Sequence, residues 1–294
     1  MTVRELYHKG TEQLKEVGIQ EAEIDAWILL EFVTGISRAS FYANPQALIE
    51  DAKAEVFLKG IQKRKTHIPL QHITGEQEFM GLTFRVNEHV LIPRQDTETL
   101  VECAQGWLRP GIRILDMCTG SGCILISLLM QCNAKGIKPE NSLGVDVSKE
   151  ALLVARENAK KYGLSVPMIE SDLFEAVEAT FDLIVSNPPY IKTAAIQELA
   201  VEVQEYDPYL ALDGKEDGLY FYRKIICQSS SYLNFGGHLC FEIGYDQATE
   251  VVALMEKEGF ENVTVKKDLT GLDRVVWGVY NKAEKKEKET CLIN

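Results

Sequence analysis

The most constraining feature of this chain is the alternation of strand-like and helix-like segments from about residue 95 to residue 280. Alternation with helices of this length favours a mostly parallel sheet covered by helices on both faces. The last two strands are separated only by a short loop around residues 270–273, so they should form an antiparallel hairpin. Strands are predicted at 112–117, 142–147, 166–170, 181–186, 237–243, 261–266 and 273–280, and helices at 96–108, 122–131, 149–162, 217–230 and 246–258.

The residues before this region have a different periodicity. Residues 2–66 repeat apolar side chains at helical spacing, and Pro69 ends the pattern. We therefore predict a helical domain over 1–67, a β-hairpin linker over 68–95, an α/β domain over 96–281 and a disordered charged tail over 282–294. The apolar residues assigned to helices are Leu6, Leu14 and Val17, then Ile24, Trp27, Ile28, Leu30 and Phe32, and on a helix over 46–65 Leu48, Ala52, Val56, Phe57 and Ile61.

Composition narrows the possible partners. The formal net charge of -13 argues against a nucleic-acid partner, because such binding depends on Lys and Arg neutralising phosphates. No apolar run reaches the roughly 18 residues of a membrane span, and the N-terminus does not read as a signal peptide, so we expect a cytoplasmic protein without membrane association. The seven cysteines form no CxxC pair and no cluster with zinc spacing, so no metal site is expected.

The first candidate site is a glycine-containing turn in the sequence IRILDMCTGSGC, residues 112–123. An apolar strand ends at Asp116, and a tight turn through Thr119, Gly120, Ser121 and Gly122 begins a helix. Ligands bind at such strand–helix turns in parallel sheets. A plain turn and a nicotinamide site stay open at this point, although Leu125 stands where the third glycine of a dinucleotide motif would fall.

Two further acidic residues end the next predicted strands. Asp146 could accept hydrogen bonds from both ribose hydroxyls of a nucleoside, or could cap the following helix. Asp172 could accept from an adenine amine with Leu173 beside the ring, or could be a turn residue. Together with the motif that follows, these residues favour S-adenosyl-L-methionine, with S-adenosyl-L-homocysteine as the product.

The second candidate site is the sequence FDLIVSNPPYI, in which an apolar strand ends in Asn187, Pro188, Pro189 and Tyr190. Two adjacent prolines have no N–H and make the loop stiff. The Asn187 side-chain oxygen and the Pro188 carbonyl could hold both N–H bonds of a planar amide, and Tyr190 could stack on it. Catalysis would then depend on positioning and electrostatics. The competing interpretation is a rigid surface turn.

These motifs occur within a longer resemblance. From about residue 68 to 280 the chain resembles the peptide chain release factor glutamine methyltransferases. The matching pieces are PLQHITGEQEFMG (69–81), VLIPRQDTETLVE (90–102), ILDMCTGSGC (114–123), SDLF (171–174), IVSNPPYI (184–191), LALDGKEDGLYFYRKI (210–225), FEIGYDQ (241–247) and GLDRVVWG (271–278). The Asn-Pro-Pro-Tyr box is shared with enzymes that methylate amino groups of DNA and RNA, whereas the other blocks are more particular to this family.

The resemblance implies a seven-stranded, mostly parallel methyltransferase sheet with helices on both faces, behind a helical domain that grips the protein substrate. It implies methylation of the glutamine side-chain amide in the Gly-Gly-Gln motif of release factors. Arg94, Asp96 and Glu98 would lie near the active site, or would form a salt-bridged helix start. The implied acceptor-site residues are Asn187, Pro188, Pro189 and Tyr190, and the cofactor-binding candidates are Asp116, Cys118, Thr119, Gly120, Ser121, Gly122, Asp146, Asp172 and Leu173.

The chain departs from the family at two positions. Cys118 stands where the family's turn usually begins with glycine, so a Cβ could crowd the methionine end of the cofactor. Leu173 stands where some members carry Trp, which would weaken stacking on adenine.

Two other functions compete with this one. The first is methylation of an amino group on a nucleic-acid base by the same two acceptors. The second is a non-catalytic nucleotide-binding protein that docks release factors or ribosomal partners, for which Asn187 would be dispensable. We expect a monomer that acts on release factors.

Overall fold

The computed structural model describes residues 1–281 and divides into two compact units. The helical unit comprises Met1–Glu76 together with Ala200–Tyr206, and the α/β unit comprises Gln77–Leu199 and residues 207–281. The charged tail predicted over 282–294 lies outside the described residues. Within residues 1–281, no helix has both the length and the apolar character needed to cross a membrane.

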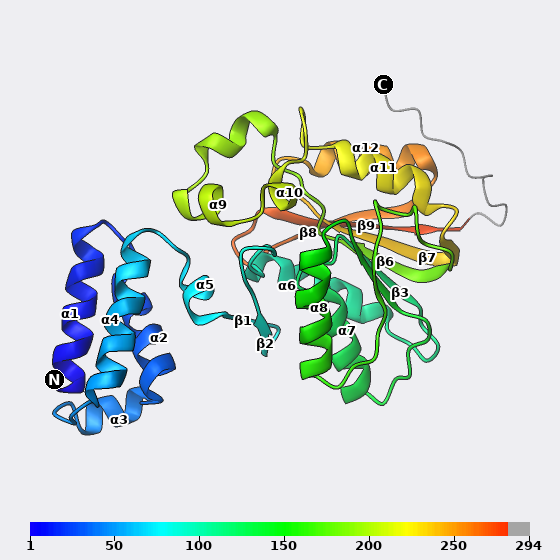
Figure 1. Ribbon diagram of the computed structural model, residues 1–294. Coiled ribbons are helices and arrows are strands. Elements are labelled where there is room, and N and C mark those ends of the chain that lie inside the picture. The colour runs from blue at the N-terminus through cyan, green and yellow to red at the C-terminus, as the bar shows by residue number, and fades with distance from the viewer. Residues whose placement is uncertain (282–294) are drawn as a thin grey trace. The chain divides into compact units, whose positions relative to one another are not determined.

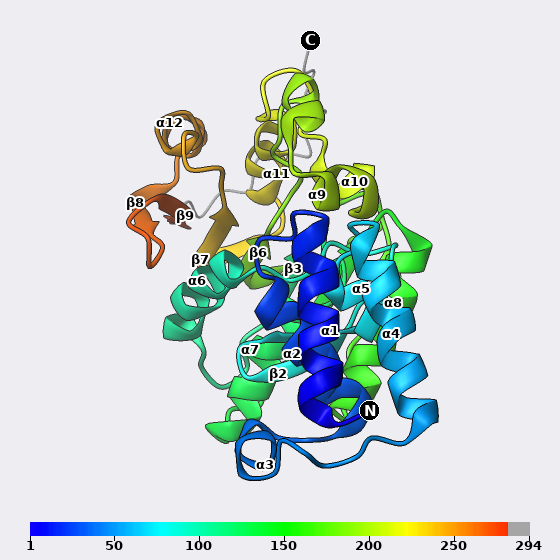
Figure 2. The same ribbon diagram turned by 90° about the vertical axis from the view of Figure 1, so that its left-hand side faces the viewer.

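The helical unit is built around three helices that contact one another, α1 (Val3–Glu16), α2 (Ala22–Thr34) and α4 (Asp51–Lys65) (Figure 2). Thr2 and Glu5 begin α1 with a reciprocal capping box, which satisfies two backbone N–H groups at the helix start. Leu6, Phe57 and Leu30 are fully buried in its core. The remaining helices of the unit are α3 (Arg38–Ala43), α5 (Leu70–Thr74) and α9 (Val201–Tyr206).

The buried face of α2 differs from the apolar face predicted from its sequence. Ile24, Ile28 and Phe32 are 47%, 42% and 52% exposed, whereas Trp27 and Leu30 are buried. Nine of the thirteen residues of α2 are apolar and lie on several sides of the helix, so the spacing of apolar residues alone does not identify the buried face. Leu48 and Val56 are likewise exposed rather than buried, and α5 occupies residues expected to belong to the β-hairpin segment.

A buried ion-pair cluster attaches α9 to the rest of the helical unit. The Arg64 guanidinium lies 2.7 Å from Asp25 and 2.5 Å from Glu202, and only 7% of its side chain is exposed. Burial raises the pKa of the Asp25 carboxyl, and the opposing effect of Arg64 is smaller. The cluster therefore holds charges that would be costly to leave unpaired.

The α/β unit contains a seven-stranded sheet of order β5-β4-β3-β6-β7-β9-β8. The first five strands in this order are parallel, and β9 runs antiparallel to both β7 and β8. The predicted seven-stranded, mostly parallel sheet and its final hairpin are thus confirmed. The strands are β3 (Ile114–Met117), β4 (Leu143–Asp146), β5 (Met168–Glu170), β6 (Phe181–Ser186), β7 (Leu233–Glu242), β8 (Glu261–Lys267) and β9 (Asp273–Tyr280).

Helices cover both faces of this sheet, with α6, α7 and α8 on one side and α11 and α12 on the other (Figure 1). Alternate strand residues supply the two cores: Leu115 and Ile184 face α11 and α12, whereas Ile114 and Leu183 face the other layer. The helices are α6 (Gln95–Ala104), α7 (Cys123–Ala134), α8 (Lys149–Lys161), α11 (Tyr220–Ser229) and α12 (Ala248–Glu258). Shorter elements are β1 (Glu76–Phe79), β2 (Leu82–Arg85), η1 (Gln105–Trp107), η2 (Thr193–Glu198) and α10 (Tyr209–Leu212).

The strand order reverses at β3. From β3 the chain adds β4 and then β5 on one side, and it crosses to the opposite side of β3 to form β6. At such a reversal the following loops diverge and leave a crevice at the carboxyl edge of the sheet. The register pairs Met117 with Ser186, so the glycine turn after β3 and the Asn-Pro-Pro-Tyr loop after β6 leave the sheet side by side.

Replacing Arg64 with Ala should lower the free energy of unfolding by about 3–5 kcal/mol, because Asp25 would remain buried without its partner. Urea denaturation measures this change. Lys59→Ala provides the control, because its pair with Glu55 is exposed and worth only about 0.3–0.5 kcal/mol. Equal losses for the two variants would contradict a stabilising role of the buried cluster.

Candidate active site

The turn after β3 has an unusual backbone. Cys118, Gly120 and Gly122 all have positive φ angles of 60°, 53° and 80°, a region that glycine adopts freely and cysteine rarely does. A Cβ on Gly120 would meet no atom within 4 Å, so this part of the turn faces open space. A Cβ on Gly122 would lie 2.9 Å from Ile126 and 3.3 Å from Ala155. Gly122 therefore allows close packing of α7 against α8, while Gly120 shapes the exposed surface of the turn.

Asp116 supports this turn from beneath. Its carboxylate is fully buried and accepts hydrogen bonds from the Thr119 hydroxyl at 2.6 Å and the Leu125 N–H at 3.3 Å. Burial raises the pKa of Asp116 to about 7, and the two hydrogen bonds offset this only in part. Asp116 does not line the cavity described below.

Asp146 joins the turn to the end of β4. One carboxylate oxygen accepts the Gly120 N–H at 2.9 Å, and the other accepts the Ser148 N–H at 2.9 Å. Burial raises the pKa of Asp146, and the backbone N–H groups, of which Ser148 contributes most, oppose it. Ser148 itself caps α8 by accepting from Ala151, so Asp146 is not the helix cap. The Asp146 side chain is therefore fixed in place at the carboxyl edge of the sheet.

A cavity of about 350 Å³ lies at this edge, within the range of small-molecule sites. It brings together the turn after β3, the ends of β4 and β5, and the loop after β6. Of the predicted site residues, Pro188 and Tyr190 do not line it, and neither do Asp116 and Gly122. Those that do line it are Cys118, Thr119, Gly120, Ser121, Asp146, Asp172, Leu173, Asn187 and Pro189.

Within residues 1–281, two oxygens of the loop after β6 accept no hydrogen bond. The Asn187 side-chain nitrogen donates to the Thr97 hydroxyl at 3.4 Å, which leaves the Asn187 side-chain oxygen available. Among residues 1–281, no hydrogen bond is formed to the Pro188 carbonyl. Ser186, at the end of β6, donates to the Met117 carbonyl at 2.7 Å and so ties the start of this loop to β3.

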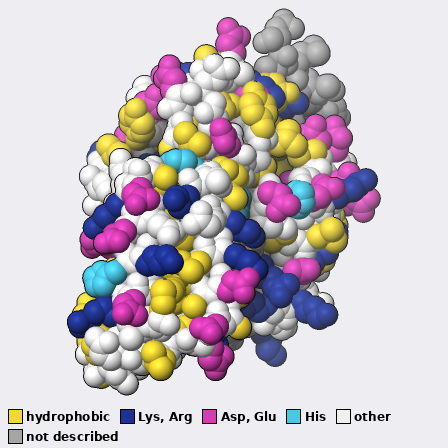
Figure 3. Space-filling model, turned by 60° about the vertical axis from the view of Figure 1, so that its left-hand side comes forward, with side chains coloured by type: hydrophobic (Ala, Val, Ile, Leu, Met, Phe, Trp, Pro, Cys, Tyr) yellow, Lys and Arg dark blue, Asp and Glu magenta, His cyan; other side chains and the backbone are white. Residues whose placement is uncertain are grey.

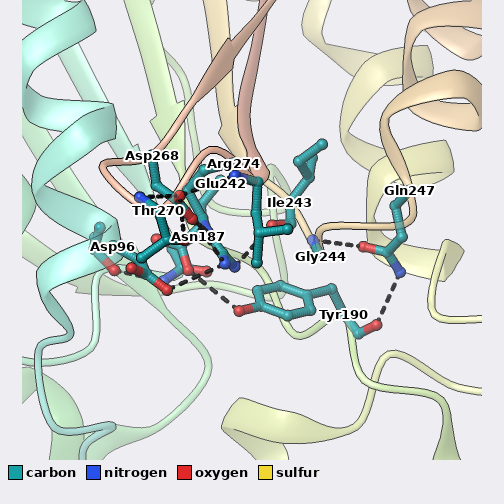
Figure 4. A network of polar contacts seen from close by, with 12 residues as sticks. Asp96, Asn187, Tyr190, Glu242, Ile243, Gly244, Gln247, Asp268, Thr270 and Arg274 are labelled. Carbon is teal, nitrogen blue, oxygen red and sulfur yellow. Dashed lines mark hydrogen bonds and ion pairs between the residues drawn. The ribbon is translucent and has the colours of Figure 1, made fainter.

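Tyr190 is held from two sides (Figure 4). Its hydroxyl donates to Glu242 at 3.3 Å, and its backbone carbonyl accepts from the Gln247 side chain at 3.0 Å. Gly214 packs so closely behind it that a Cβ there would lie 2.7 Å from the Tyr190 backbone. The ring therefore braces the loop, and its predicted stacking on an acceptor group stays a prediction.

Glu242 is a buried carboxylate among the polar side chains near Tyr190 (Figure 4). Burial raises the pKa of Glu242 to about 7, although the Thr97 hydroxyl, the charge of Arg274 and the Tyr190 hydroxyl each favour the ionised form. Arg274 in turn lies 3.1 Å from Asp96 and 3.2 Å from Asp268. Tyr190 thus ties the Asn187 loop to β7, Asn187 ties it to Thr97 on α6, and Arg274 ties β9 to the start of α6.

The cavity has the chemistry that S-adenosylmethionine requires. Asp146 and Asp172 line it with carboxylates, which accept from hydroxyl and amine donors, and Leu173 adds an apolar side chain beside them. The open surface at Gly120 leaves room for the cofactor to approach the backbone. Within the described part of the chain, no group of three or more His, Cys, Asp or Glu side chains could hold a metal ion.

Comparison with known proteins identifies the family. A model of the PrmC N-terminal domain matches residues 5–75, and a model of the methyltransferase small domain matches residues 95–205. A release factor glutamine methyltransferase of Geobacter sulfurreducens is 39% identical over 278 residues, covering 94% of this chain and 96% of that protein. One of Clostridium botulinum is 39% identical over 283 residues, covering 94% and 98%. The chain belongs to the release factor glutamine methyltransferase family.

Solved structures support the fold. A methyltransferase from Pyrococcus furiosus superposes with a TM-score of 0.51 at 18% identity, covering 79% of this chain and all of that chain. The family assignment and the α/β methyltransferase fold inferred from the sequence motifs are both confirmed by these comparisons.

The remaining residues that the family resemblance placed near the active site, or marked as a departure from the family, make structural contacts or line the cavity. Arg94 lines the cavity and pairs with Asp207 at 2.6 Å, and Asp96 pairs with Arg274. Glu98 accepts the Met80 N–H and so holds the β1–β2 hairpin. The Cys118 side chain lines the cavity, and burial raises the pKa of its thiol, which keeps it protonated.

Thr97, Glu242 and Arg274 were not predicted as site residues. They lie in three of the segments that carry the family resemblance, VLIPRQDTETLVE, FEIGYDQ and GLDRVVWG. Their place in these segments was the one feature of the sequence that could have marked them as site residues. Their contribution could not be derived from the sequence alone, because α6, β7 and β9 meet only in the folded sheet.

Asp116→Asn should flatten the pH dependence of stability. The folded protein retains a proton on Asp116 up to about pH 7, whereas the unfolded chain releases it near pH 4, so the stabilisation is present at low pH and is lost as pH rises. The free energy of unfolding of the variant, relative to wild type, should therefore increase between about pH 5 and 7. Urea titrations at several pH values measure this difference. A difference independent of pH would contradict the raised pKa.

Proposed function

We propose that this chain transfers a methyl group from S-adenosylmethionine to the side-chain amide nitrogen of the glutamine in the Gly-Gly-Gln motif of peptide chain release factors. The observation that carries the proposal is the adjacency of the cofactor turn after β3 and the Asn187 loop after β6. Membership of the release factor glutamine methyltransferase family supports the substrate.

The chemistry that the residues must perform is mainly positioning. An amide nitrogen is a weak nucleophile because its lone pair is delocalised. The Asn187 side-chain oxygen and the Pro188 carbonyl, both free of other hydrogen bonds, would accept its two N–H bonds and direct its remaining face toward the cavity. Pro188 and Pro189 keep these oxygens in place, so little reorganisation accompanies the reaction.

When bound, the cofactor supplies an electrophilic methyl group on a sulfonium. The amide nitrogen held by Asn187 and Pro188 would bond to that carbon as the carbon–sulfur bond breaks, and the nitrogen would then lose a proton to solvent. S-adenosylhomocysteine and an N-methylated glutamine result. Because the methylated nitrogen is strongly acidic until it loses its proton, the site needs no strong general base.

The helical unit gives the enzyme a second surface for its protein substrate. We propose that residues 1–67 form the substrate-recognition domain, joined by the segment 68–95 to the catalytic domain over 96–281. Ile24, Ile28 and Phe32 lie one turn apart on α2 and are all exposed, which produces an apolar stripe suited to protein contact. With a release factor as substrate, we expect the enzyme to work in the cytoplasm, and as a monomer.

The alternative substrate is an amino group of a nucleic-acid base, which the same two acceptors could hold. The net charge of -13 opposes it. On the face shown in Figure 3, acidic and basic side chains are interspersed, although basic side chains gather in one area to the right of the centre. Methyl-transfer assays should therefore test DNA and ribosomal RNA as substrates in parallel with the release factor, and we expect transfer only to the release factor.

Mass spectrometry of a purified release factor, after incubation with the enzyme and the methyl donor, should show one added methyl group on the Gly-Gly-Gln peptide. Asn187→Ala should reduce methyl transfer by at least about 100-fold, because one of the two orienting acceptors is lost, while cofactor binding is retained. The exposed Asn133→Ala should behave as wild type. The proposal would be contradicted if the enzyme methylated nucleic acid and not the release factor, or if Asn187→Ala kept full methyl-transfer activity.

Asp146→Ala should weaken cofactor binding by about 10-fold or more, because the carboxylate that orders the turn and faces the ribose is removed. Isothermal titration with S-adenosylhomocysteine measures the dissociation constant. Asp217→Ala is the control, because its ion pair with Arg223 lies outside the cavity. Unchanged binding by Asp146→Ala would remove this residue from the cofactor site.

A further inference from the structure

The acceptor loop, residues 187–190, has no backbone donors at its centre. Pro188 and Pro189 carry no N–H, so other segments can hold this part of the chain only through its carbonyl groups. The Pro188 carbonyl has to stay free if it is to receive a substrate amide. The first carbonyl after the two prolines is that of Tyr190, and a donor from elsewhere in the protein can hold it without occupying the acceptor site.

Gln247 supplies this donor. It lies immediately before α12, is 6% exposed, and its side-chain nitrogen donates to the Tyr190 carbonyl at 3.0 Å (Figure 4). The same nitrogen donates to the Gly218 carbonyl at 3.3 Å, and the side-chain oxygen accepts the Gly244 N–H at 2.9 Å. All three partners are backbone groups, which cannot exchange the roles of donor and acceptor. The Gln247 amide therefore has one favourable orientation, with its nitrogen toward the loop.

Glycines make room for this side chain and for the end of the loop. A Cβ on Gly218 would lie 2.7 Å from the Gln247 nitrogen and would also collide with the Tyr190 carbonyl oxygen. A Cβ on Gly214 would lie 2.7 Å from the Tyr190 backbone, and a Cβ on Gly244 would lie 2.9 Å from the Gln247 oxygen. The contact between Gln247 and Tyr190 is thus closely enclosed, which leaves the Tyr190 carbonyl little room to move.

The start of the acceptor loop is fixed as well. Ser186, the residue before the loop, donates to the Met117 carbonyl of β3 at 2.7 Å. The loop is therefore held at its start by β3 and at its end by Gln247, and the two prolines between these points have fixed φ angles. Releasing the end at Tyr190 would leave only the start and the prolines to define where the acceptor oxygens lie.

We propose that Gln247 is a positioning residue, which holds the Tyr190 carbonyl and thereby keeps the Asn187 side-chain oxygen and the Pro188 carbonyl in place for the substrate amide. This inference rests on the proposed function, because it assumes that these two oxygens receive that amide. Gln247 does not line the cavity, so it acts through the loop. Loss of its hydrogen bonds should therefore lower kcat and leave cofactor affinity unchanged.

The first experiment measures steady-state methylation of a release factor and, separately, binding of S-adenosylhomocysteine by isothermal titration. Gln247→Met keeps a side chain of similar length but removes its hydrogen bonds, and it should lower kcat by about 10- to 100-fold with unchanged affinity for S-adenosylhomocysteine. Tyr162→Phe is the control, because the Tyr162 hydroxyl also bonds two backbone groups, those of Thr83, away from the cavity. This control should lower the melting temperature without lowering kcat.

A second pair of variants disturbs the same contact from the opposite side. Gly218→Ala would place a Cβ against both the Tyr190 carbonyl and the Gln247 nitrogen, and it should lower kcat by at least about 10-fold. Gly236→Ala is the matched control, because the φ angles of Gly218 and Gly236 are 76° and 74° but a Cβ on Gly236 would meet no atom within 4 Å. Both variants place alanine in the left-handed region, and only Gly218→Ala adds the collision. Gly236→Ala should keep the kcat of wild type.

A double-mutant cycle tests whether Gln247 acts through the acceptor oxygens. Gln247→Met should lower kcat less in an Asn187→Ala background than in wild type, because one of the two oxygens that it positions is already absent. Fully additive losses would show that Gln247 affects the reaction by another route, and would overturn the inference.

The outcomes separate this inference from the function on which it rests. Full activity of Gln247→Met, a loss of cofactor affinity as large as its loss of kcat, or equal losses in Gly218→Ala and Gly236→Ala would overturn the role of Gln247 and leave the proposed function intact. Should Gln247→Met lose its cooperative melting transition, the two glycine variants decide the question. Fully active Asn187→Ala, or wild-type enzyme that does not methylate the release factor, would instead defeat the proposed function.

Discussion

The pairing of β3 with β6 is the constraint on which the rest of the site depends. Parallel neighbours end at the same edge of a sheet, and the register of Met117 with Ser186 makes the cofactor turn and the acceptor loop adjacent. The hydrogen bond from Ser186 to the Met117 carbonyl fixes the point where the two segments separate. A shift in this register would move one loop relative to the other and break up the cavity that both loops line.

The acceptor loop is stiff for two physical reasons. Its prolines restrict the backbone locally, and hydrogen bonds to Glu242 on β7 and Thr97 on α6 hold the Tyr190 and Asn187 side chains. A buried carboxylate and guanidinium are costly to desolvate, so such groups are weak evidence for stability. The Glu242 carboxylate accepts from the Tyr190 hydroxyl, so it has a geometric role in holding the loop.

The sequence was sufficient to predict those elements that depend on residues close together in the chain. Strand–helix alternation predicted the sheet, its final hairpin and most of its helices, and glycine and proline predicted the two functional loops. The prediction was wrong for the buried face of α2, because a helix with apolar residues on several sides offers more than one possible buried face. No prediction was made for the short helices η2, α9 and α10. Such short helices depend on tertiary contacts, as in the ion pair between Glu202 of α9 and Arg64.

The sequence by itself therefore determined the fold class, the family and the two loops that meet at the sheet edge. Only the tertiary structure decided that Asp116 supports the turn rather than lining the cavity, that Tyr190 hydrogen bonds to Glu242, and that Asn187 hydrogen bonds to Thr97. The physical reason is distance along the chain. Periodicity and turn chemistry act over a few residues, whereas Thr97, Asn187 and Glu242 come from three elements that only the packed sheet brings together.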